Sequence, residues 1–300
     1  MKILFLGGTG LLGFAVEREI KSFGHEVIFA GKSTIDLTNR ENTFQYFERI
    51  MPDTIILAAS VVGGIYANRK NPIKYLSENI QIYVNAIDAA SKFNVDRLIF
   101  ISSSIIYPEN SKSPIRVNSI LSGKLNIDTQ YFAVAKIAGV KLIEANRICG
   151  RKKWVTINLS NLYGLNDNTD YETSHVIPSL INKIDNARLN NEESILISGS
   201  PSSRREFMNS VDAAKAILHI LFNELFEPSI INVGSGVSTS IQELSELIAD
   251  MVGFKGEIKF EEKASASSEK ILDSSYILSH GWQPRVTLES GLREIIDNQP

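Results

Sequence analysis

The stretch "LFLGGTGLLGFAV", residues 4–16, decides the fold because it joins an apolar strand to a helix through a glycine-rich turn. Gly7, Gly10 and Gly13 follow the spacing G-x-x-G-x-x-G, and Gly8 adds an overlapping G-x-G-x-x-G. Glycines lack a Cβ, so backbone N–H groups can approach a pyrophosphate at the N-terminus of the helix. The same glycines interrupt the apolar N-terminal run, which argues against a secretory signal peptide. The stretch therefore predicts a dinucleotide-binding turn.

Short apolar runs alternate with helix-length amphipathic segments through the first half of the chain. The runs lack the polar alternation of a half-exposed sheet, so we expect parallel strands that helices cover on both faces. The pattern predicts an α/β fold with a doubly wound parallel (Rossmann) sheet. Expected strands are residues 2–7, 25–30, 53–59, 97–103 and 154–160, and expected helices are 11–23, 39–50, 75–93 and 131–149.

The pattern loosens after residue 163, where a polar, turn-rich segment begins. We therefore expect a dinucleotide-binding domain over 1–163, with return segments near 207–233, and a smaller C-terminal α/β substrate domain over 164–300. The expected elements of this second domain are a helix over 178–190, a strand pair and a helix within 194–223, a helix over 240–252, and short strands near 257–260 and 286–288 around the serine-rich loop "KASASSEK" at 263–270.

Composition excludes several classes of function. With 300 residues, 43% of them hydrophobic, the chain can bury one large α/β core, alone or with a small satellite domain. A net charge of −3 gives no electrostatic attraction to nucleic acid or to an anionic membrane. Cys149 is the single cysteine, which excludes an internal disulfide and a cysteine-based zinc site, and the histidines lack metal-ligand spacing. No apolar run is long enough to predict a membrane span, so we expect a cytoplasmic protein.

The end of the second expected strand bears on the choice of dinucleotide. Its sequence "FAGKSTIDL", residues 29–37, has no acidic residue directly at the strand tip. An acidic residue there binds the ribose hydroxyls of NAD and repels a 2′-phosphate. Lys32 at this place favours NADPH, although a solvated surface lysine is the alternative, and Asp36 is expected near the adenine end. NADP(H) is therefore the expected cofactor.

Several short blocks spread along the chain carry a family resemblance. They are "AASVVGGIYANRKNP" (58–72), "SSSIIYP" (102–108), "AKIAGVKL" (135–142), "NLYG" (161–164), "SHVIPSL" (174–180), "RREF" (204–207) and "INVGSG" (231–236). With these blocks the chain resembles the extended short-chain dehydrogenase/reductases, and within them the GDP-L-fucose synthase family of GDP-4-keto-6-deoxymannose epimerase/reductases. The "VGGI.AN" and "SHVIP" pieces are specific to that family.

The resemblance implies roles for individual residues. Ser103 matches the serine that hydrogen-bonds the C4 oxygen of the substrate, Lys136 the lysine that binds the nicotinamide ribose, and His175 the acid/base histidine of epimerisation. Implied cofactor-binding residues are Gly7, Thr9, Gly10, Leu11, Leu12, Gly13, Lys32, Asp36, Leu37, Ala58, Ala59, Ser60, Lys136, Asn161, Leu162 and His175. Implied substrate-binding residues are Gly64, Ser103, Ser104, Asn161, Lys183, Arg205 and Lys270, of which Arg205 and Lys270 match groups that reach the nucleotide diphosphate.

Some positions depart from the pattern of the family. Phe132 stands where the family has its catalytic tyrosine. Ile105 occupies the position of the cysteine that shuttles protons with the histidine during epimerisation. Ser198 replaces a tryptophan near the nucleotide. Thr9 replaces an arginine that helps to hold the 2′-phosphate, which weakens the case for NADPH without reversing it.

The segment "DTQYFAVAKIAGV", residues 128–140, raises the question whether Tyr131 can stand in for the missing phenol. Residues four apart in a helix are separated by about 400° of rotation and share a face. Residues five apart are turned by about a further 100°, so Tyr131 is directed away from Lys136 unless the helix bulges. We therefore expect that the phenol is lost from the site.

The retained Ser103, Lys136 and glycine turn leave several explanations of Phe132. Exchanging a tyrosine for phenylalanine deletes one oxygen atom and keeps the shape of the ring, so we interpret Phe132 as an engineered replacement that traps a bound substrate. The alternatives are a natural loss of catalysis and a reductase with another proton donor. Losing one positioned general acid costs about 10²–10⁴-fold in rate, so impaired turnover with intact ligand binding is expected.

The expected activity is NADPH-dependent reduction of the C4 ketone of a GDP-4-keto-deoxy sugar or a related heptose. Inverting C3 or C5 requires an acid and a base on opposite faces of the sugar, and Ile105 can be neither, so we expect no epimerase activity. The alternatives are a bifunctional 3,5-epimerase/4-reductase of the GDP-L-fucose synthase type and a non-catalytic sensor of NADPH or a nucleotide sugar. The superfamily also implies a homodimer through helices 75–93 and 131–149.

Overall fold

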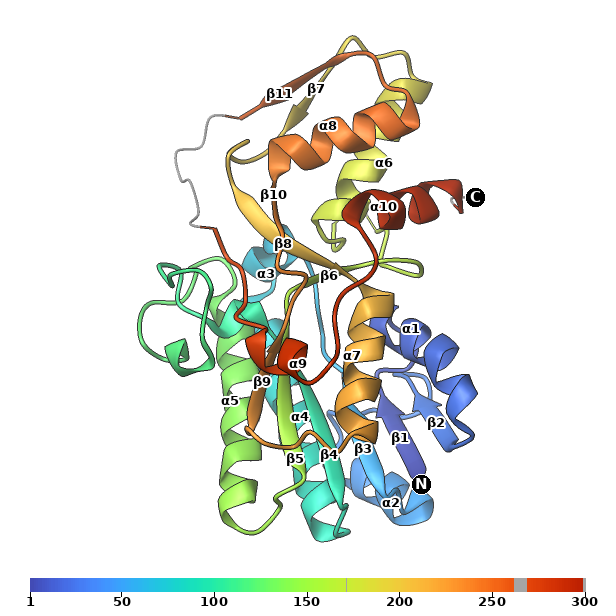
Figure 1. The fold of residues 1–300 in the computed structure, drawn as a ribbon, viewed down its shortest axis with the longest axis vertical. Helices are drawn as coiled ribbons and strands as arrows, with labels where there is room; N and C mark the ends of the chain where they lie inside the picture. The colour runs from blue at the N-terminus through green and yellow to red at the C-terminus, as the bar shows by residue number, and fades with distance from the viewer. Residues whose placement is uncertain (171, 262–268, 299–300) are drawn as a thin grey trace.

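The computed structural model describes residues 1–170, 172–261 and 269–298, and a parallel sheet forms its base. The strands, from one edge of the sheet to the other, are β2 (Glu26–Ala30), β1 (Lys2–Leu6), β3 (Thr54–Leu57), β4 (Arg97–Ser103), β5 (Trp154–Leu159) and β9 (Ile230–Val233). Every neighbouring pair is parallel (Figure 1). The chain leaves β1 toward one edge and returns to its other side with β3, which makes this point a topological switch where ligands bind in such sheets.

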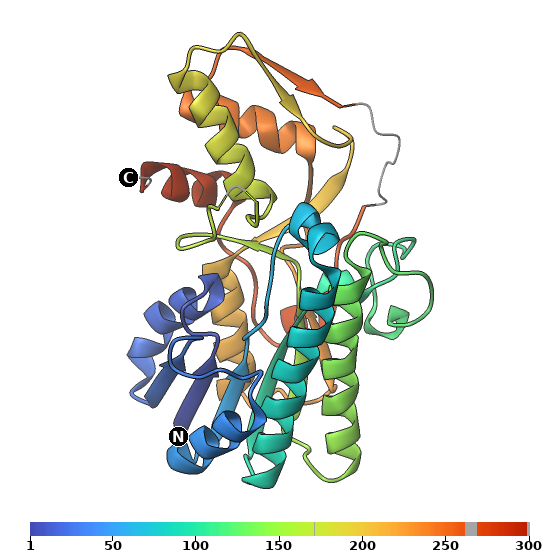
Figure 2. The same ribbon diagram turned by 180° about the vertical axis from the view of Figure 1, so that it is seen from behind.

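Helices cover both faces of the sheet, as Figures 1 and 2 show from opposite sides. One face packs against α1 (Leu11–Ile20) and α7 (Ser210–Phe222), and the other against α2 (Arg40–Ile50), α4 (Pro72–Lys92) and α5 (Gln130–Ile148). The predicted doubly wound α/β fold is therefore confirmed. Shorter helical pieces are η1 (Lys21–Phe23), α3 (Ile65–Lys70), η2 (Ser104–Ile106) and η3 (Val117–Ser119).

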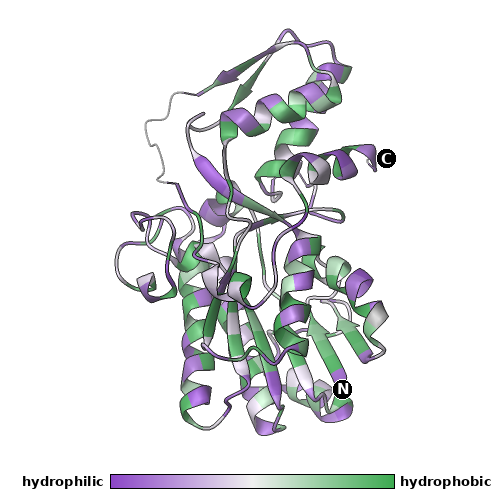
Figure 3. Cartoon of the chain, viewed as in Figure 1, coloured by the Kyte–Doolittle hydropathy of each residue, from purple (hydrophilic) through white to green (hydrophobic). Residues whose placement is uncertain are grey.

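The apolar strands supply both cores because successive side chains of a strand point to opposite faces. Ile3 and Phe5 of β1 join the buried cluster beneath α1 and α7, whereas Leu4 and Leu6 join the cluster beneath α2, α4 and α5. Burying one such side chain stabilises the fold by about 1.5–3 kcal/mol. Figure 3 shows hydrophobic residues concentrated in the strands and on the inner faces of the helices. Burial on both faces explains why the strand sequences lack polar alternation.

A smaller group of elements lies beyond the carboxyl edge of the sheet (Figure 1). Its helices α6 (Val176–Leu189), α8 (Ile241–Val252) and α10 (Leu288–Asp297) share a third hydrophobic cluster. Its strands form a parallel pair, β7 (Ser194–Ile197) with β11 (Glu257–Phe260), and a separate sheet of β10 (Ser238–Ser240), β8 (Arg204–Asn209) and β6 (Asn161–Tyr163). The short helix α9 (Ser275–Ser279) packs against β9. The exact domain boundary stays a prediction.

Some expected details of this C-terminal part are wrong. The strands expected within 194–223 do not pair with each other, because β7 pairs with β11 and β8 pairs with β6 and β10. The strand expected near 286–288 is the start of α10, where Thr287 Oγ1 caps the helix by accepting a hydrogen bond from Ser290 N at 3.1 Å. Most of the loop at 263–270 lies outside the described residues. Within the described part of the chain, no helix could cross a bilayer and no group of side chains could hold a metal ion.

Candidate active site

The glycine-rich turn between β1 and α1 packs against the segment that leaves β3. Gly7 has a φ of +100°, and a Cβ on it would lie 2.7 Å from the N of Ala59. A Cβ on Gly13 would lie 2.4 Å from the carbonyl O of Gly8. Gly10 caps α1 without a side-chain hydrogen bond, which leaves the first N–H groups of the helix for an anion. The turn therefore fits a dinucleotide pyrophosphate, because it excludes side chains where the backbone must come close.

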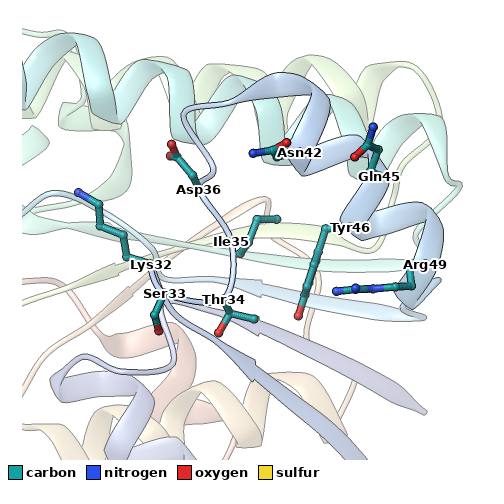
Figure 4. A pocket seen from close by; sticks show the side chains of 9 residues that line it. All are labelled: Lys32, Ser33, Thr34, Ile35, Asp36, Asn42, Gln45, Tyr46 and Arg49. Atoms are coloured by element: carbon teal, nitrogen blue, oxygen red, sulfur yellow. The ribbon is translucent and has the colours of Figure 1, made fainter.

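A pocket of about 450 Å³ lies beyond the tip of β2 (Figure 4). A Cβ on Gly31 would lie 2.5 Å from Cγ2 of Thr9, so the side chain of Thr9 reaches the same edge of the sheet. The cations Lys32 and Arg49 lie at opposite ends of the pocket and can attract a phosphate. Arg49 was not singled out from the sequence. The lining residues are Lys32, Ser33, Thr34, Ile35, Asp36, Asn42, Gln45, Tyr46 and Arg49.

The side chains of Asp36 and Leu37 have partners within the protein. The carboxylate of Asp36 accepts hydrogen bonds from Thr38 Oγ1 at 2.6 Å and Thr38 N at 3.0 Å. These hydrogen bonds, with the charge of Lys32, hold the pKa of Asp36 below its usual value. Leu37 is buried in the core, and its carbonyl accepts a hydrogen bond from Asn85 Nδ2 at 2.9 Å. The predicted place of Asp36 near the adenine end and the predicted cofactor contact of Leu37 stay predictions.

Lys136 of α5 lies at the centre of the site and is only 4% exposed. Its Nζ donates to the carbonyl O of Ile101 in β4 at 2.7 Å and to Oγ of Ser60 at 2.8 Å. Ser60 Oγ also lies 2.8 Å from the hydroxyl of Tyr83. Burial lowers the pKa of Lys136 to about 7 because desolvation disfavours the charged ammonium. The amine therefore ties α5 to β4 and to the segment after β3, which also carries Ala58 and Ala59.

Phe132, and not Tyr131, faces Lys136. The Nζ of Lys136 lies 5.7 Å from the centroid of the Phe132 ring. Phe132 is 8% exposed, whereas Tyr131 is 44% exposed. Because α5 is continuous from Gln130 to Ile148, no bulge brings Tyr131 inward. The prediction from helical spacing is confirmed: the hydroxyl of Tyr131 does not reach this position.

Ser103 and Ser104 lie where β4 passes into η2, a segment that packs against α5. Ser103 Oγ accepts a hydrogen bond from Ile105 N at 3.5 Å. The next turn is fixed by Tyr107, whose hydroxyl donates to Asn232 Oδ1 at 2.5 Å and accepts from Asn158 Nδ2 at 2.8 Å. This buried network joins the end of β4 to β5 and β9. It therefore holds Ser103 at the carboxyl edge of the sheet, beside the helix that carries Lys136.

His175 precedes α6 and is half-buried beside Gly64. Its Nδ1 lies 3.8 Å from Oδ1 of Asp167, a residue that was not singled out from the sequence. Gly64 N donates to the carbonyl O of Thr173 at 3.1 Å. A Cβ on Gly64 would lie 2.7 Å from the carbonyl O of Ser174. The structure therefore brings together the predicted Gly64 and the loop that carries His175.

The segment after β5 crosses back over the glycine turn. Asn166 Nδ2 donates to the carbonyl O of Thr9 at 3.4 Å. A Cβ on Gly164 would lie 3.4 Å from Cδ1 of Leu11. Asn161 Nδ2 donates to the carbonyl O of Glu206 at 3.0 Å, and Leu162 packs on the core beneath α1. Asn161 and Leu162 therefore lie between the dinucleotide turn and the C-terminal elements; the family resemblance implies contact of both with the cofactor and of Asn161 also with the substrate.

Arg205 of β8 and Lys270 form a positive cluster. Burial lowers the pKa of Lys270, and repulsion from Arg205 lowers it further. Burial also lowers the pKa of Arg205, while attraction to Glu109 opposes both shifts. A nucleotide diphosphate would neutralise these like charges. Lys183 is exposed and donates to the carbonyl O of Leu196 in β7, so the structure does not join it to this cluster.

Glu206 is a buried carboxylate next to Arg205 and is 1% exposed. Its Oε1 accepts a hydrogen bond from Gly236 N at 2.7 Å, and its Oε2 accepts one from Leu272 N at 2.9 Å. Burial raises the pKa of Glu206 to about 7. Glu206 lies within "RREF", and its role was not predicted from the sequence. Its contacts show that it holds the segment of Lys270 against β8.

Comparison with known proteins shows similarity over nearly the whole chain. The model of the NAD dependent epimerase/dehydratase family matches residues 3–234. A putative GDP-L-fucose synthase 2 of Arabidopsis thaliana is 37% identical over 297 residues, which cover 98% of this chain and 90% of that protein. A GDP-6-OMe-4-keto-L-xylo-heptose reductase of C. jejuni has a TM-score of 0.91 at 27% identity, covering 99% of this chain and 96% of its own. A GDP-mannoheptose C4 reductase of Campylobacter jejuni with NADP bound has a TM-score of 0.87 at 28% identity, covering 99% and 97%.

Gly7→Ala is expected to weaken NADPH binding at least about tenfold, a loss of about 1.4 kcal/mol. The added Cβ would displace the backbone of Ala59, which lies 2.7 Å away, and would distort the turn. Gly24→Ala is the matched control, because Gly24 also has a positive φ, +66°, but has nothing within 4 Å of its Cβ position. Titration of NADPH fluorescence measures both variants. Equal affinities in the two variants would contradict the role of Gly7.

Glu206→Gln is expected to change how stability depends on pH. The pKa of Glu206 is raised from 4.5 to about 7 in the folded chain, so the folded state binds the proton more tightly than the unfolded state. Its contribution to stability is therefore present at about pH 4.5 and is lost as the pH rises through about 7. The thermal midpoint of the unaltered chain should fall relative to that of Glu206→Gln between about pH 5 and 8.

Glu243→Gln provides a control of opposite sign. The N–H of Ser240 donates to Glu243 Oε2 at 2.7 Å and lowers the pKa of that carboxyl. Stability from Glu243 is therefore present at neutral pH and is lost as the pH falls through its lowered pKa. Parallel midpoint curves for the unaltered chain and Glu206→Gln would refute the raised pKa of Glu206.

Proposed function

Because the chain belongs to the NAD dependent epimerase/dehydratase family, we propose that it is an NADPH-dependent 4-ketoreductase of nucleotide sugars. Its substrate in this proposal is a GDP-4-keto-deoxy sugar or a related heptose. Relatives named as GDP-L-fucose synthase and as reductases of GDP-heptoses support the GDP-linked sugar, since they match nearly the full chain. The NADP bound to the mannoheptose reductase supports the cofactor.

One observation carries the proposal: Lys136, Ser103 and the glycine turn meet at the same edge of the sheet. Lys136 Nζ bonds the carbonyl of Ile101, two residues before Ser103 on β4, at 2.7 Å. NADPH supplies a hydride when it is bound. Ser103 then hydrogen-bonds the C4 oxygen as negative charge develops on it, while Lys136 orients the nicotinamide ribose and contributes positive charge.

The two ends of the site suit the two ligands. Lys32 and Arg49 beside β2 favour the 2′-phosphate of NADPH, with the hydroxyls of Ser33 and Thr34 in the same pocket. Arg205 and Lys270 receive the diphosphate of the nucleotide sugar. Ser104, Gly64 and Asn161 complete the proposed sugar site between them, whereas Lys183 requires a movement of its side chain away from Leu196.

Phe132 impairs the proton transfer that completes the reduction. The ring fills the position beside Lys136 but carries no hydroxyl, so binding is retained while position 132 supplies no proton. We keep the interpretation that Phe132 replaces a tyrosine of a parent sequence. That parent would use the tyrosine as general acid, with the positive charge of Lys136 stabilising the phenolate.

Ile105 makes the proposed enzyme a reductase without epimerase activity. His175 is the residue that the resemblance assigns to acid/base chemistry in epimerisation, and inversion at C3 or C5 needs a second group on the opposite face. Ile105 instead packs in the apolar cluster of Phe132. A bifunctional epimerase/reductase is the alternative, and it would require another residue to take the second proton.

A non-catalytic sensor of NADPH or a nucleotide sugar is the second candidate function, and the absent phenol at position 132 favours it. For either function we propose a cytoplasmic homodimer. The outer surfaces of α4 and α5 support a dimer, because Ile73 is 79% exposed and both Tyr131 and Val134 are 44% exposed. Such apolar side chains are typical of an interface.

Phe132→Tyr is expected to raise kcat by about 10²-fold, because a positioned general acid contributes about 10²–10⁴-fold. NADPH oxidation with a GDP-4-keto-6-deoxy sugar measures the gain. Phe23→Tyr adds a phenol to an exposed ring of η1, which stacks on Phe222 outside the site, and should leave kcat unchanged. A Phe132→Tyr variant that binds both ligands yet oxidises no NADPH would favour the sensor.

Reduction by Phe132→Tyr in D₂O is expected to give a product without deuterium at C3 and C5 and with both centres unchanged. The physical reason is that Ile105 offers no proton to the face opposite His175. The un-epimerised 4-keto sugar is the substrate, and NMR spectroscopy of the product is the measurement. Deuterium at both carbons together with inverted configuration would establish the bifunctional alternative.

A further inference from the structure

Tyr75, in the first turn of α4, packs directly against Phe132. The two rings meet edge-on, with centroids 6.4 Å apart and an interplanar angle of 79°. Tyr75 is 4% exposed. Val61 and Ile105 pack against the same small cluster. The phenol of Tyr75 is therefore in direct contact with the ring at position 132, where the family carries its catalytic tyrosine.

The hydroxyl of Tyr75 is directed to the loop at residues 62–64. It lies 3.5 Å from the carbonyl O of Val62, which is at the limit of a hydrogen bond. A Cβ on Gly63 would lie 2.2 Å from this hydroxyl, so the phenol occupies the space that a side chain at 63 would fill. Gly64 follows at once and packs against Ser174, next to His175. The hydroxyl therefore lies where the proposed sugar-binding loop, the His175 loop and Phe132 converge.

Other tyrosines that the structure describes near the site are bound or turned away. The Tyr83 hydroxyl lies 2.8 Å from Ser60 Oγ and donates to Asn79 Oδ1 at 3.3 Å. Tyr107 is held between two asparagines, as described above. Tyr66 is 59% exposed and Tyr131 is 44% exposed. Of the buried tyrosines Tyr75, Tyr83 and Tyr107, Tyr75 thus has the longest hydrogen bond from its hydroxyl to the protein.

We propose that Tyr75 donates the proton to the C4 oxygen in place of the phenol that position 132 lacks. The inference rests on the proposed ketone reduction. A hydride from the nicotinamide of NADPH forms the new C–H bond, the C=O π electrons become a lone pair on oxygen, and NADP⁺ remains. The O–H bond of Tyr75 breaks as its proton passes to this alkoxide. The phenolate then regains a proton from water, which completes the cycle.

The surroundings of Tyr75 suit a group that is protonated before the hydride moves. Burial raises its pKa, so the phenol keeps its proton through the neutral range. The developing phenolate needs positive charge nearby, and the Nζ of Lys136 lies 5.7 Å from the centroid of the Phe132 ring, which Tyr75 also contacts. The alkoxide formed by reduction is a far stronger base than a phenolate, so the transfer is downhill.

Tyr75→Phe in the unaltered chain tests the proposal. We expect kcat with NADPH and a GDP-4-keto-6-deoxy sugar to fall at least about tenfold, because the general acid is removed. Affinities for NADPH and for GDP, measured by titration, should change less than about twofold, since the hydroxyl has only one long hydrogen bond to lose. Tyr276→Phe, which removes a hydroxyl that bonds the carbonyl O of Glu227 from α9, is the matched control and should keep the rate of the unaltered chain.

The same substitution in a Phe132→Tyr background separates catalysis from structure. With the phenol restored at position 132, Tyr75→Phe should cost less than about threefold in kcat, because the acid role is filled. An equal loss in both backgrounds would mean that Tyr75 serves packing, and would overturn the proposal. A rate in the unaltered chain that falls as the pH rises through about 7 would assign the proton to Lys136 instead, and would also overturn it.

Failure of this inference is distinguishable from failure of the proposed function. If Phe132→Tyr reduces the sugar but the unaltered chain shows no turnover above that of Tyr75→Phe, Tyr75 donates no proton and the reductase assignment stands. If Phe132→Tyr also leaves NADPH unoxidised, the reductase assignment itself is wrong and the role of Tyr75 is overturned with it.

Discussion

The buried amine of Lys136 is the constraint on which the rest of the site depends. A charge removed from water costs several kcal/mol unless hydrogen bonds and nearby electron density replace its hydration. Here the carbonyl of Ile101 and the hydroxyl of Ser60 accept its hydrogen bonds, and the rings of Tyr83 and Phe100 lie 4.9 and 5.2 Å from Nζ. These partners come from β4, α4 and the segment after β3. The amine can be buried only when the sheet and helices are assembled, so the fold and the site form together.

Two separate devices hold the two ligands of the proposed reaction. Close backbone packing makes the dinucleotide turn, because Gly7 and Gly13 leave no space for a side chain. The diphosphate end relies on charge instead: Arg205 and Lys270 are brought together although they repel. Glu206 offsets part of that cost by bonding the N–H of Leu272, which holds the segment of Lys270 against β8. Asn161, which bonds the carbonyl of Glu206, joins the two devices.

Phe132 and Tyr75 contribute different properties to the site: Phe132 fills the volume beside Lys136, and Tyr75 carries a hydroxyl group. The ring of Phe132 keeps the packing against Lys136, while the phenol that packs against this ring belongs to α4. Helices α4 and α5 pack along each other, so residues far apart in sequence present their rings to one cluster. A scaffold of this kind can retain its ligand contacts while the hydroxyl moves from one helix to the other. Such a move changes the direction of proton delivery more than the volume of the site.

The sequence by itself determined the doubly wound sheet, the glycine turn and the direction of Tyr131 away from Lys136. Each of these follows from local rules: apolar runs between helical segments, glycine spacing before a helix, and the rotation between residues four and five apart. Residues 286–288 were wrongly expected to form a strand because a helix cap at Thr287 was not recognised. The places of the Arg49, Asp167, Glu206 and Tyr75 side chains in the fold could not be read from local patterns. Only the tertiary structure decided them, because each depends on burial and on partners from distant segments, which set the charge, the pKa and the direction of a side chain.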